Sequence, residues 1–129
     1  MSVDDATGTL QTITNDVTNF TMNTPVAVQD ITGVDKSAHE RLLLLSDGTV
    51  TLNGVFNAAA DMSHAVLSTV PSTDVTRTVT ISPTATATPS LTMEMLLTSY
   101  NLTRSNAGEL TWSTEGSLQS GTQPTWDNT

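Results

Sequence analysis

The chain has 129 residues, no cysteine and a formal net charge of −9, with 13 acidic against 4 basic side chains. Its length suits one domain with a single core, and the lack of cysteine excludes a disulfide framework and a thiolate metal site. The acidic balance excludes tight binding to duplex DNA and to anionic membranes, because both require clusters of lysine and arginine.

The N-terminal residues lack the basic and apolar segments of a signal peptide. The longest apolar run, Leu42–Leu45, is much shorter than the ~20 residues that a helix needs to cross a bilayer. We therefore expect a soluble protein that does not insert into a membrane.

Threonine contributes 26 of the residues, and this β-branched side chain favours strands over helices. Alternating or apolar segments predict strands over 10–20, 26–32, 49–57, 77–81, 91–97, 100–104 and 110–116. The Thr, Ala and Pro run Ser82–Ser90 is expected to be a loop. We expect a flexible N-terminal arm at 1–9, a β-rich domain at 10–116 and a polar tail at 117–129.

Two segments have apolar residues at helical spacing. The first is 36–44, with Asp35 as its N-cap, and the second is 58–69, which begins after Asn57 and ends before Pro71. The combined pattern predicts a mainly β, single-domain barrel or sandwich with one or two short α-helices packed against it.

Two side-chain pairs suggest catalysis, and neither completes a known site. His39-Glu40 begins like the helix of a zinc protease, but leucine stands at 43, where the second histidine is required. Asp61 and His64 lie at helical spacing and could act as an orienter and a base. However, no nucleophile elbow surrounds Ser63 or Ser68.

Other chemistries have weaker support. A glycosidase needs two facing carboxylates, which a sequence cannot display, and the chain has only five Phe, Tyr and Trp residues to form a sugar cleft. Residues 30–35 lack the alternating oxygen ligands of a calcium loop. We expect no catalytic residues, no metal ligands and no cofactor.

Several short segments form an informative pattern through the order in which they follow one another along the chain. The segments are residues 28–33, a stretch containing Ala38, Glu40, Leu42 and Leu43, residues 47–57, the alanine-rich 58–68, and then 100–104, 106–111 and 124–126. In this order they resemble the tail tube (major tail) proteins of long-tailed bacteriophages. The likeness spans residues 11–126, and Ser82–Ser90 departs from the family pattern.

The resemblance implies a virion protein that acts by assembling with itself. Six subunits would form a ring, and stacked rings would form a hollow tube through which DNA passes as unspecific cargo. The implied partners are further copies of the chain, the tail tip or baseplate, the tape measure protein, and chaperone and terminator proteins. Assembly would take place in the host cytoplasm. The same fold class builds the tubes of bacterial contractile injection machines.

An acidic channel wall would let DNA slide, because it repels phosphates at close range and offers them no cation. Asp47, Glu94 and Glu109 lie in or beside predicted strands and are the candidate lumen-facing acids. An equal alternative to acids that face the lumen is that the acidic residues lie on the outside of the tube and keep the subunit soluble. The rival functions are a β-sandwich module that binds a glycan or a protein within a larger assembly, and an enzyme that uses Asp61 and His64 or a pair of carboxylates that the sequence does not reveal.

Overall fold

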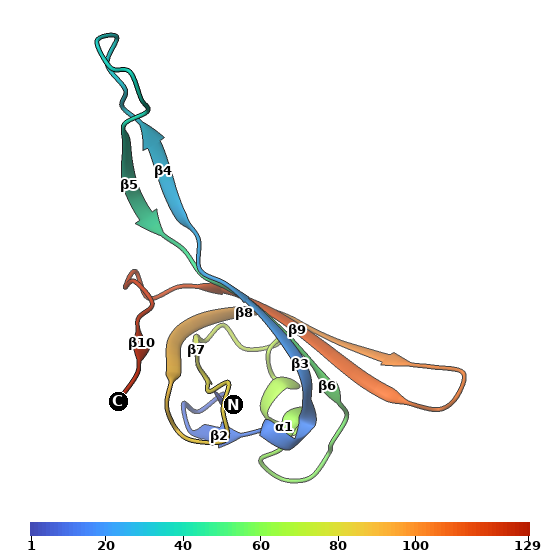
Figure 1. Cartoon of the computed structure of the whole chain (residues 1–129). Coiled ribbons are helices and arrows are strands. Elements are labelled where there is room, and N and C mark those ends of the chain that lie inside the picture. The colour runs from blue at the N-terminus through green and yellow to red at the C-terminus, as the bar shows by residue number, and fades with distance from the viewer.

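The computed structural model describes all residues, 1–129, as a folded body from which two hairpins project, the longer one formed by residues 24–48 and the other by the region around residues 101–111 (Figure 1). The strands and helices are β1 (Ser2–Asp4), β2 (Leu10–Thr12), the 3-10 helix η1 (Thr14–Asp16), β3 (Val17–Asn23), β4 (Val26–Asp30), β5 (Arg41–Ser46), β6 (Thr49–Val55), α1 (Ser63–Leu67), β7 (Arg77–Ile81), β8 (Ser90–Arg104), β9 (Leu110–Leu118) and β10 (Trp126–Asp127).

Eight strands form one antiparallel sheet in the order β2-β1-β7-β8-β9-β6-β3, with β10 pairing the start of β8. The sheet is open, and β2 and β3 are its outer strands. β4 and β5 pair only with each other. The predicted mainly β fold with a short helix against the sheet is confirmed.

Alternation along the central strands produces one apolar face. Val50, Leu52 and Gly54 of β6 are buried, whereas the intervening residues are exposed or half-buried. β9 continues the pattern, because Gly116, Thr114 and Trp112 pair with those three residues. Since successive side chains on a strand point to opposite faces, the sheet has a core face and a polar face.

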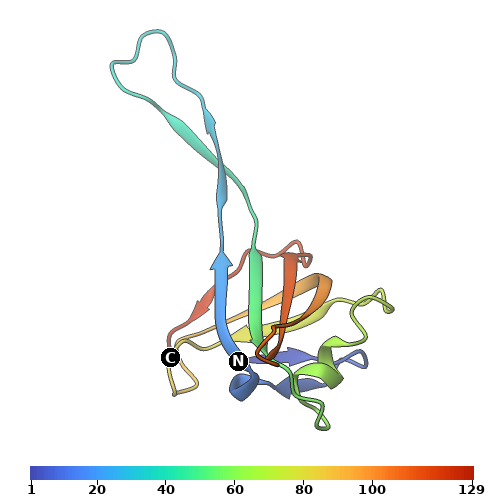
Figure 2. The same cartoon turned by 90° about the vertical axis from the view of Figure 1, so that its right-hand side faces the viewer.

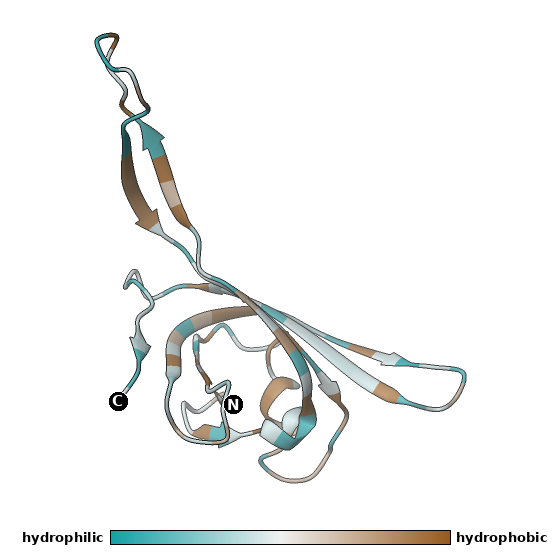
Figure 3. Ribbon diagram, viewed as in Figure 1, coloured by the Kyte–Doolittle hydropathy of each residue, from teal (hydrophilic) through white to brown (hydrophobic).

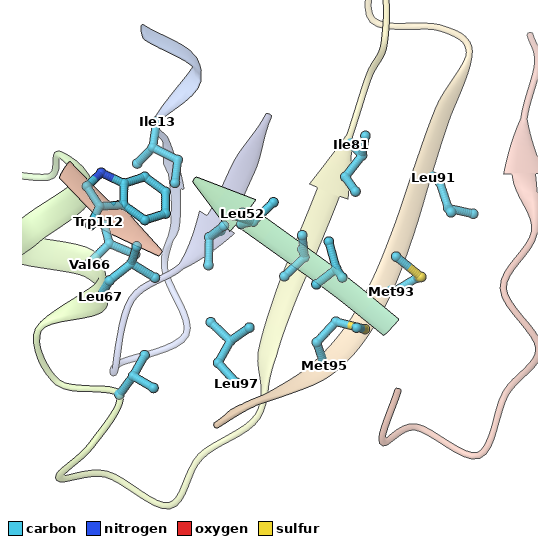
Figure 4. Packing of buried hydrophobic residues seen from close by; sticks show 14 residues of the cluster. Ile13, Leu52, Val66, Leu67, Ile81, Leu91, Met93, Met95, Leu97 and Trp112 are labelled. Atoms are coloured by element: carbon cyan, nitrogen blue, oxygen red, sulfur yellow. The ribbon is translucent and has the colours of Figure 1, made fainter. Parts of the chain in front are cut away.

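The core lies between this apolar face, α1 and the N-terminal segment (Figure 4). Trp112 is its largest member, and its indole Nε1 donates a hydrogen bond of 2.8 Å to the Val55 carbonyl. Gly54 is required beneath this ring, because a Cβ there would overlap the Asp16 carbonyl oxygen and lie 2.6 Å from Trp112 Cζ2. The remaining members are Val3, Ile13, Val50, Leu52, Val66, Leu67, Val70, Val79, Ile81, Leu91, Met93, Met95 and Leu97.

Arg77 is almost fully buried, and it connects three parts of the chain. Its guanidinium donates hydrogen bonds to the Asp4 carbonyl at 2.9 Å, to the Val66 carbonyl at 3.0 Å, and to the hydroxyls of Thr69 and Thr73. Burial lowers its pKa, and the nearby Asp5 and Asp4 charges oppose that shift. Arg77 therefore joins β1 to α1 and to the turn that follows α1.

Replacing Arg77 by leucine is expected to reduce the free energy of unfolding by about 3 kcal/mol, because the buried carbonyls lose their donor. Urea denaturation of the monomer would measure the loss, with the exposed Arg104→Leu as the matched control. A loss below about 1 kcal/mol, the size of an average substitution effect, would contradict this role for Arg77.

Asp16 anchors the start of α1 from a distant part of the sequence. Its carboxylate accepts hydrogen bonds from the Ser63 amide at 2.9 Å and from Asn57 Nδ2 at 3.0 Å. Burial by itself would raise the pKa of Asp16, but these hydrogen bonds outweigh it and the pKa lies below its ordinary value. The ionised form is therefore the one that stabilises the fold.

Because the folded pKa of Asp16 is lower than the unfolded value of about 3.9, its stabilisation is complete above that pH and is lost as pH falls through the folded pKa. We expect Asp16→Asn to lower the free energy of unfolding by about 1–3 kcal/mol at neutral pH. The gap to the wild type should narrow in acid. Urea titrations at a series of pH values would measure it, and a gap that is constant with pH would contradict the assignment.

Several sequence-based boundaries need correction. The helix predicted over 36–44 is wrong, because these residues form a turn and the first part of β5. The helix predicted over 58–69 is reduced to Ser63–Leu67, since Asp61 has a φ of 61° and Met62 is extended. The strands predicted over 91–97 and 100–104 are one continuous strand, β8.

The two chain ends contribute strands to the sheet. β1 lies within residues 1–9 and pairs with both β2 and β7, and Val3 is completely buried. Within residues 117–129, β10 pairs through Trp126 and Asp127 with the beginning of β8. No helix in the structure has the length and apolar character needed to cross a membrane.

Candidate functional site

The most prominent surface feature is the projecting hairpin, called here the arm and comprising residues 24–48. β3 and β6 of the sheet run on into β4 and β5, so the arm extends directly from two paired strands (Figure 2). At its base the Asp47 amide donates a hydrogen bond of 2.9 Å to the Pro25 carbonyl. Every residue of β4 and β5 except Ser46 is exposed.

The arm carries apolar side chains on both of its strands (Figure 3). Leu43 is 70% exposed and Leu45 is 87% exposed, and Val26 and Val28 of β4 are also exposed. Exposed apolar clusters of this kind mark surfaces that another macromolecule covers. A two-stranded hairpin is marginally stable by itself, so contact with a partner would also stabilise the arm.

A network of hydrogen bonds closes the tip of the arm. The Asp30 carboxylate accepts bonds from the amide and the hydroxyl of Thr32, and its other oxygen lies 3.1 Å from His39 Nδ1. The Glu40 amide donates a bond of 2.8 Å to the Thr32 hydroxyl. The bonds from Thr32 lower the pKa of Asp30. His39 and Glu40 therefore belong to a structural turn at the tip.

The sheet presents two long open edges at its opposite sides. β3 pairs only with β6, and β8 beyond Met95 pairs only with β9. Residues 17–23 and 96–103 contain no charged side chain. Natural sheets commonly protect exposed edges with lysine, proline or other charged residues, and these two edges lack that protection.

Each open edge borders a shallow cavity. Beside β3, a cavity of about 360 Å³ is lined by Met1, Thr14, Val17, Thr18, Asn19, Phe20 and Ser82. Beside β8, a cavity of about 380 Å³ is lined by residues 70–74 and 96–98. The edges therefore offer unpaired backbone groups together with adjoining concave surface.

The structure does not bring the catalytic candidates together. His64 Nδ1 lies 3.1 Å from the Tyr100 hydroxyl, and its ring packs against Phe56, whereas Asp61 is an exposed turn residue. The Ser63 side chain is completely buried and its amide binds Asp16. No cluster of three or more His, Asp or Glu side chains suits a metal ion.

The three candidate lumen acids lie far apart in the fold. Asp47 is at the base of the arm, where its side chain accepts a bond from the Gly48 amide. Glu109 is in the turn between β8 and β9, at the other end of the sheet. Glu94 lies where β8 pairs with β7, and its carboxylate accepts a hydrogen bond of 2.8 Å from the Thr78 hydroxyl.

No protein-family model matches the chain, and no curated protein sequence matches it. Solved structures do match. A chain of the tail of an empty gene transfer agent particle, computed with helical refinement and C6 symmetry, aligns with a TM-score of 0.71 at 16% identity, over 98% of this chain and 95% of that one. This chain shares its fold with that tail chain.

A second match is a chain of the native gene transfer agent virion. It aligns with a TM-score of 0.69 at 14% identity, over 98% of this chain and 94% of that one. Because both chains of each pair are covered almost completely, the likeness in fold extends over almost the whole length of each chain.

Sequence reasoning missed the arm and the specific open edges. The leucines at 42–45 are consecutive, and such a run is ambiguous between a helix and a strand. The absence of charge over 17–23 and 96–103 was a signal in the sequence. It becomes informative only when these segments are known to be edge strands.

Proposed function

We propose that this chain is a structural virion protein that polymerises as stacked rings, six subunits to a ring, into a tail tube through which DNA passes. The observation that carries the proposal is the pair of open, uncharged edges on one sheet. Further support is the shared fold with a gene transfer agent tail chain whose structure was computed with C6 symmetry. Its place is then the virion, after assembly in the host cytoplasm.

The two edges suit each other for pairing between copies. The order β8-β9-β6-β3 is antiparallel throughout, so β3 and β8 run in opposite directions. Rotating a copy about a ring axis preserves the sense of a strand along that axis. If the strands run along the axis, β3 of one copy therefore meets β8 of the next in the antiparallel sense. Such a contact joins two different patches, which is the interface type that forms rings.

The side chains on the two edges match as well as the backbone does. On the core face, β3 presents Phe20 and β8 presents Leu102, both partly exposed in the single subunit. On the polar face, β3 presents Thr21, and β8 presents Asn101 and Thr103, so both edges carry polar side chains there. Pairing would thus extend the apolar layer and the polar layer from one copy into the next.

The arm supplies the second contact that a tube needs. It extends well beyond the body of the subunit (Figure 1), and in the proposed tube its leucines are covered by a subunit of the adjoining ring. An open axial contact lets rings be added without limit. Tail tip, tape measure, chaperone and terminator proteins are the proposed partners that start, measure and stop this growth.

We propose that the carboxylates of Asp47 and Glu109 face the lumen. Because these residues lie at opposite ends of the sheet, they would stand near the two rims of each ring. Glu94 also remains a proposed lumen acid.

Sedimentation velocity over a series of protein concentrations, combined with negative-stain microscopy, tests the proposal. We expect rings and tubes to form as concentration rises, and more readily when preformed tail tips are added. A chain that stays monomeric at high concentration even with tail tips would overturn the proposal. Binding of a glycan or a protein by that monomer would then favour the binding-module alternative.

A further inference from the structure

Glycine follows an aspartate or an asparagine at two places in the chain, Asp47-Gly48 and Asn53-Gly54. In such a pair the backbone amide of the glycine can attack the side chain of the preceding residue, because glycine has no side chain to block the approach and its backbone rotates freely. The settings of the two pairs differ. Asn53-Gly54 lies inside β6, whereas Asp47-Gly48 links β5 to β6 at the base of the arm.

At Asp47-Gly48 the reacting groups are already in contact. The Gly48 amide donates a hydrogen bond of 2.7 Å to Asp47 Oδ1, which places its nitrogen beside the carboxyl carbon that carries this oxygen. Two groups held together in this way react as one molecule at a high effective concentration. Asp47 is exposed and borders a cavity of about 430 Å³ that is also lined by residues 118, 119 and 121–123. Water therefore reaches the site.

At Asn53-Gly54 the fold keeps the same groups apart. The Asn53 side chain is turned toward β3, where its Nδ2 donates a hydrogen bond of 2.8 Å to Asn19 Oδ1. Gly54 is packed so tightly that a Cβ there would overlap the Asp16 carbonyl oxygen and lie 2.6 Å from Trp112 Cζ2. The backbone of this central strand thus has no room to rotate so that the side chain meets the next amide.

We infer that Asp47-Gly48 is a site of spontaneous isomerisation in the folded chain and that Asn53-Gly54 is protected from the corresponding reaction. The Gly48 nitrogen forms a bond to Cγ of the protonated Asp47 carboxyl group and loses its proton, while the hydroxyl of that group leaves as water. The product is a cyclic succinimide. Water then adds to the main-chain carbonyl carbon of Asp47 and breaks the bond from this carbon to the Gly48 nitrogen, which leaves an isoaspartate. The water released in the first step balances the water consumed in the second.

Isoaspartate formation changes the base of the arm, because the main chain then runs through the Asp47 side chain and is longer by a methylene group. Two hydrogen bonds hold the base on either side of the site. The Asp47 amide donates to the Pro25 carbonyl at 2.9 Å, and the Leu118 amide donates to the Gly48 carbonyl at 2.7 Å. A longer link alters this geometry and with it the direction in which the arm leaves the body. The effect on assembly rests on the proposed function, in which a misdirected arm misses the adjoining ring.

Incubation of the purified monomer at physiological temperature and pH, in water labelled with a heavy oxygen isotope, tests the site. We expect the peptide that contains Asp47 to take up the label and to separate into two forms by chromatography. An endoprotease that cuts before aspartate should fail to cut the second form at position 47. In the same sample Asn53 should stay unchanged, and it should react once urea unfolds the chain and frees Gly54.

Gly48→Ala is the matched variant. A Cβ at position 48 would lie 3.5–3.8 Å from Leu118, Met93 and Pro124, which is ordinary van der Waals contact, and the backbone there is outside the left-handed region. The variant should therefore keep the fold, which thermal unfolding would verify. Its methyl group hinders the approach of the amide nitrogen, so isoaspartate should accumulate several-fold more slowly than in the wild type.

The effect on the arm is measured by pelleting tubes from aged monomer. We expect the isoaspartate form to stay in the supernatant, and equal fractions in pellet and supernatant would overturn the effect on the arm. An Asp47 peptide that stays unchanged in the folded chain would overturn the inference itself, as would an Asn53 that reacts there as fast as Asp47. If isoaspartate forms at position 47 but no tubes form under any condition, the proposed function fails and the modification site stands.

Discussion

Replacing Leu43 and Leu45 together by aspartate is expected to abolish tube growth while leaving the monomer as stable as the wild type. These side chains are 70% and 87% exposed in the single subunit, so their loss removes little packing from the fold. In the proposed tube they are covered by an adjoining ring. Burying each leucine there is worth about 1.5–3 kcal/mol, and an aspartate would have to be desolvated in its place.

A combined loss above about 3 kcal/mol raises the concentration needed for growth more than about 100-fold, since each 1.4 kcal/mol is a factor of ten. Pelleting assays over a concentration series would measure the change, and thermal unfolding of the monomer would verify its fold. Leu10→Asp, at a 51% exposed leucine on β2, is the control. Normal tubes from the double variant would show that the arm is not the axial contact.

Replacing Leu102 by lysine is expected to prevent ring closure. Leu102 is 46% exposed on the open edge of β8, and in the proposed ring it packs beside Phe20 of the neighbouring copy. An unpaired ammonium buried at that joint costs several kcal/mol, which also corresponds to a more than 100-fold weaker association. Because the side chain reaches water in the monomer, the change should lower monomer stability by less than about 1 kcal/mol.

Sedimentation velocity would detect the loss of rings, and Val75→Lys, at a 40% exposed valine in a loop, provides the control. The variant is expected to sediment as a folded monomer at concentrations where the control forms rings and tubes. Rings formed by Leu102→Lys would exclude β8 as the lateral edge, even if the arm prediction were met. The two variants therefore test the lateral and the axial contacts separately.

The local sequence pattern was sufficient to predict a strand where that strand is half-buried in the sheet. The segment predicted over 77–81 is β7 with the same bounds, because Arg77, Val79 and Ile81 alternate with threonines. β6 and β9 were likewise close to their predicted ranges of 49–57 and 110–116. In such strands the period of two in the sequence is the same pattern that burial imposes on the fold.

Local pattern was misleading over 36–44, where the spacing of Ala38 and Leu42 suited a helix. These residues have no core to face, and Leu42 instead pairs with Gln29 across the arm. The second helix was detected, but the anchor of its first turn was not, because Ser63 takes its partner from Asp16, 47 residues earlier. Asp16 is far from Ser63 in the sequence, so no short window contains the information about this anchor.

The sequence by itself determined the β-rich class, the single domain, the lack of cysteine chemistry and the scarcity of cations, because these depend on composition and on alternation along one strand. Only the tertiary structure decided which strands are left as edges and that residues 24–48 stand away from the core. Those properties depend on strand order and register, which arise from pairing between segments far apart in the chain.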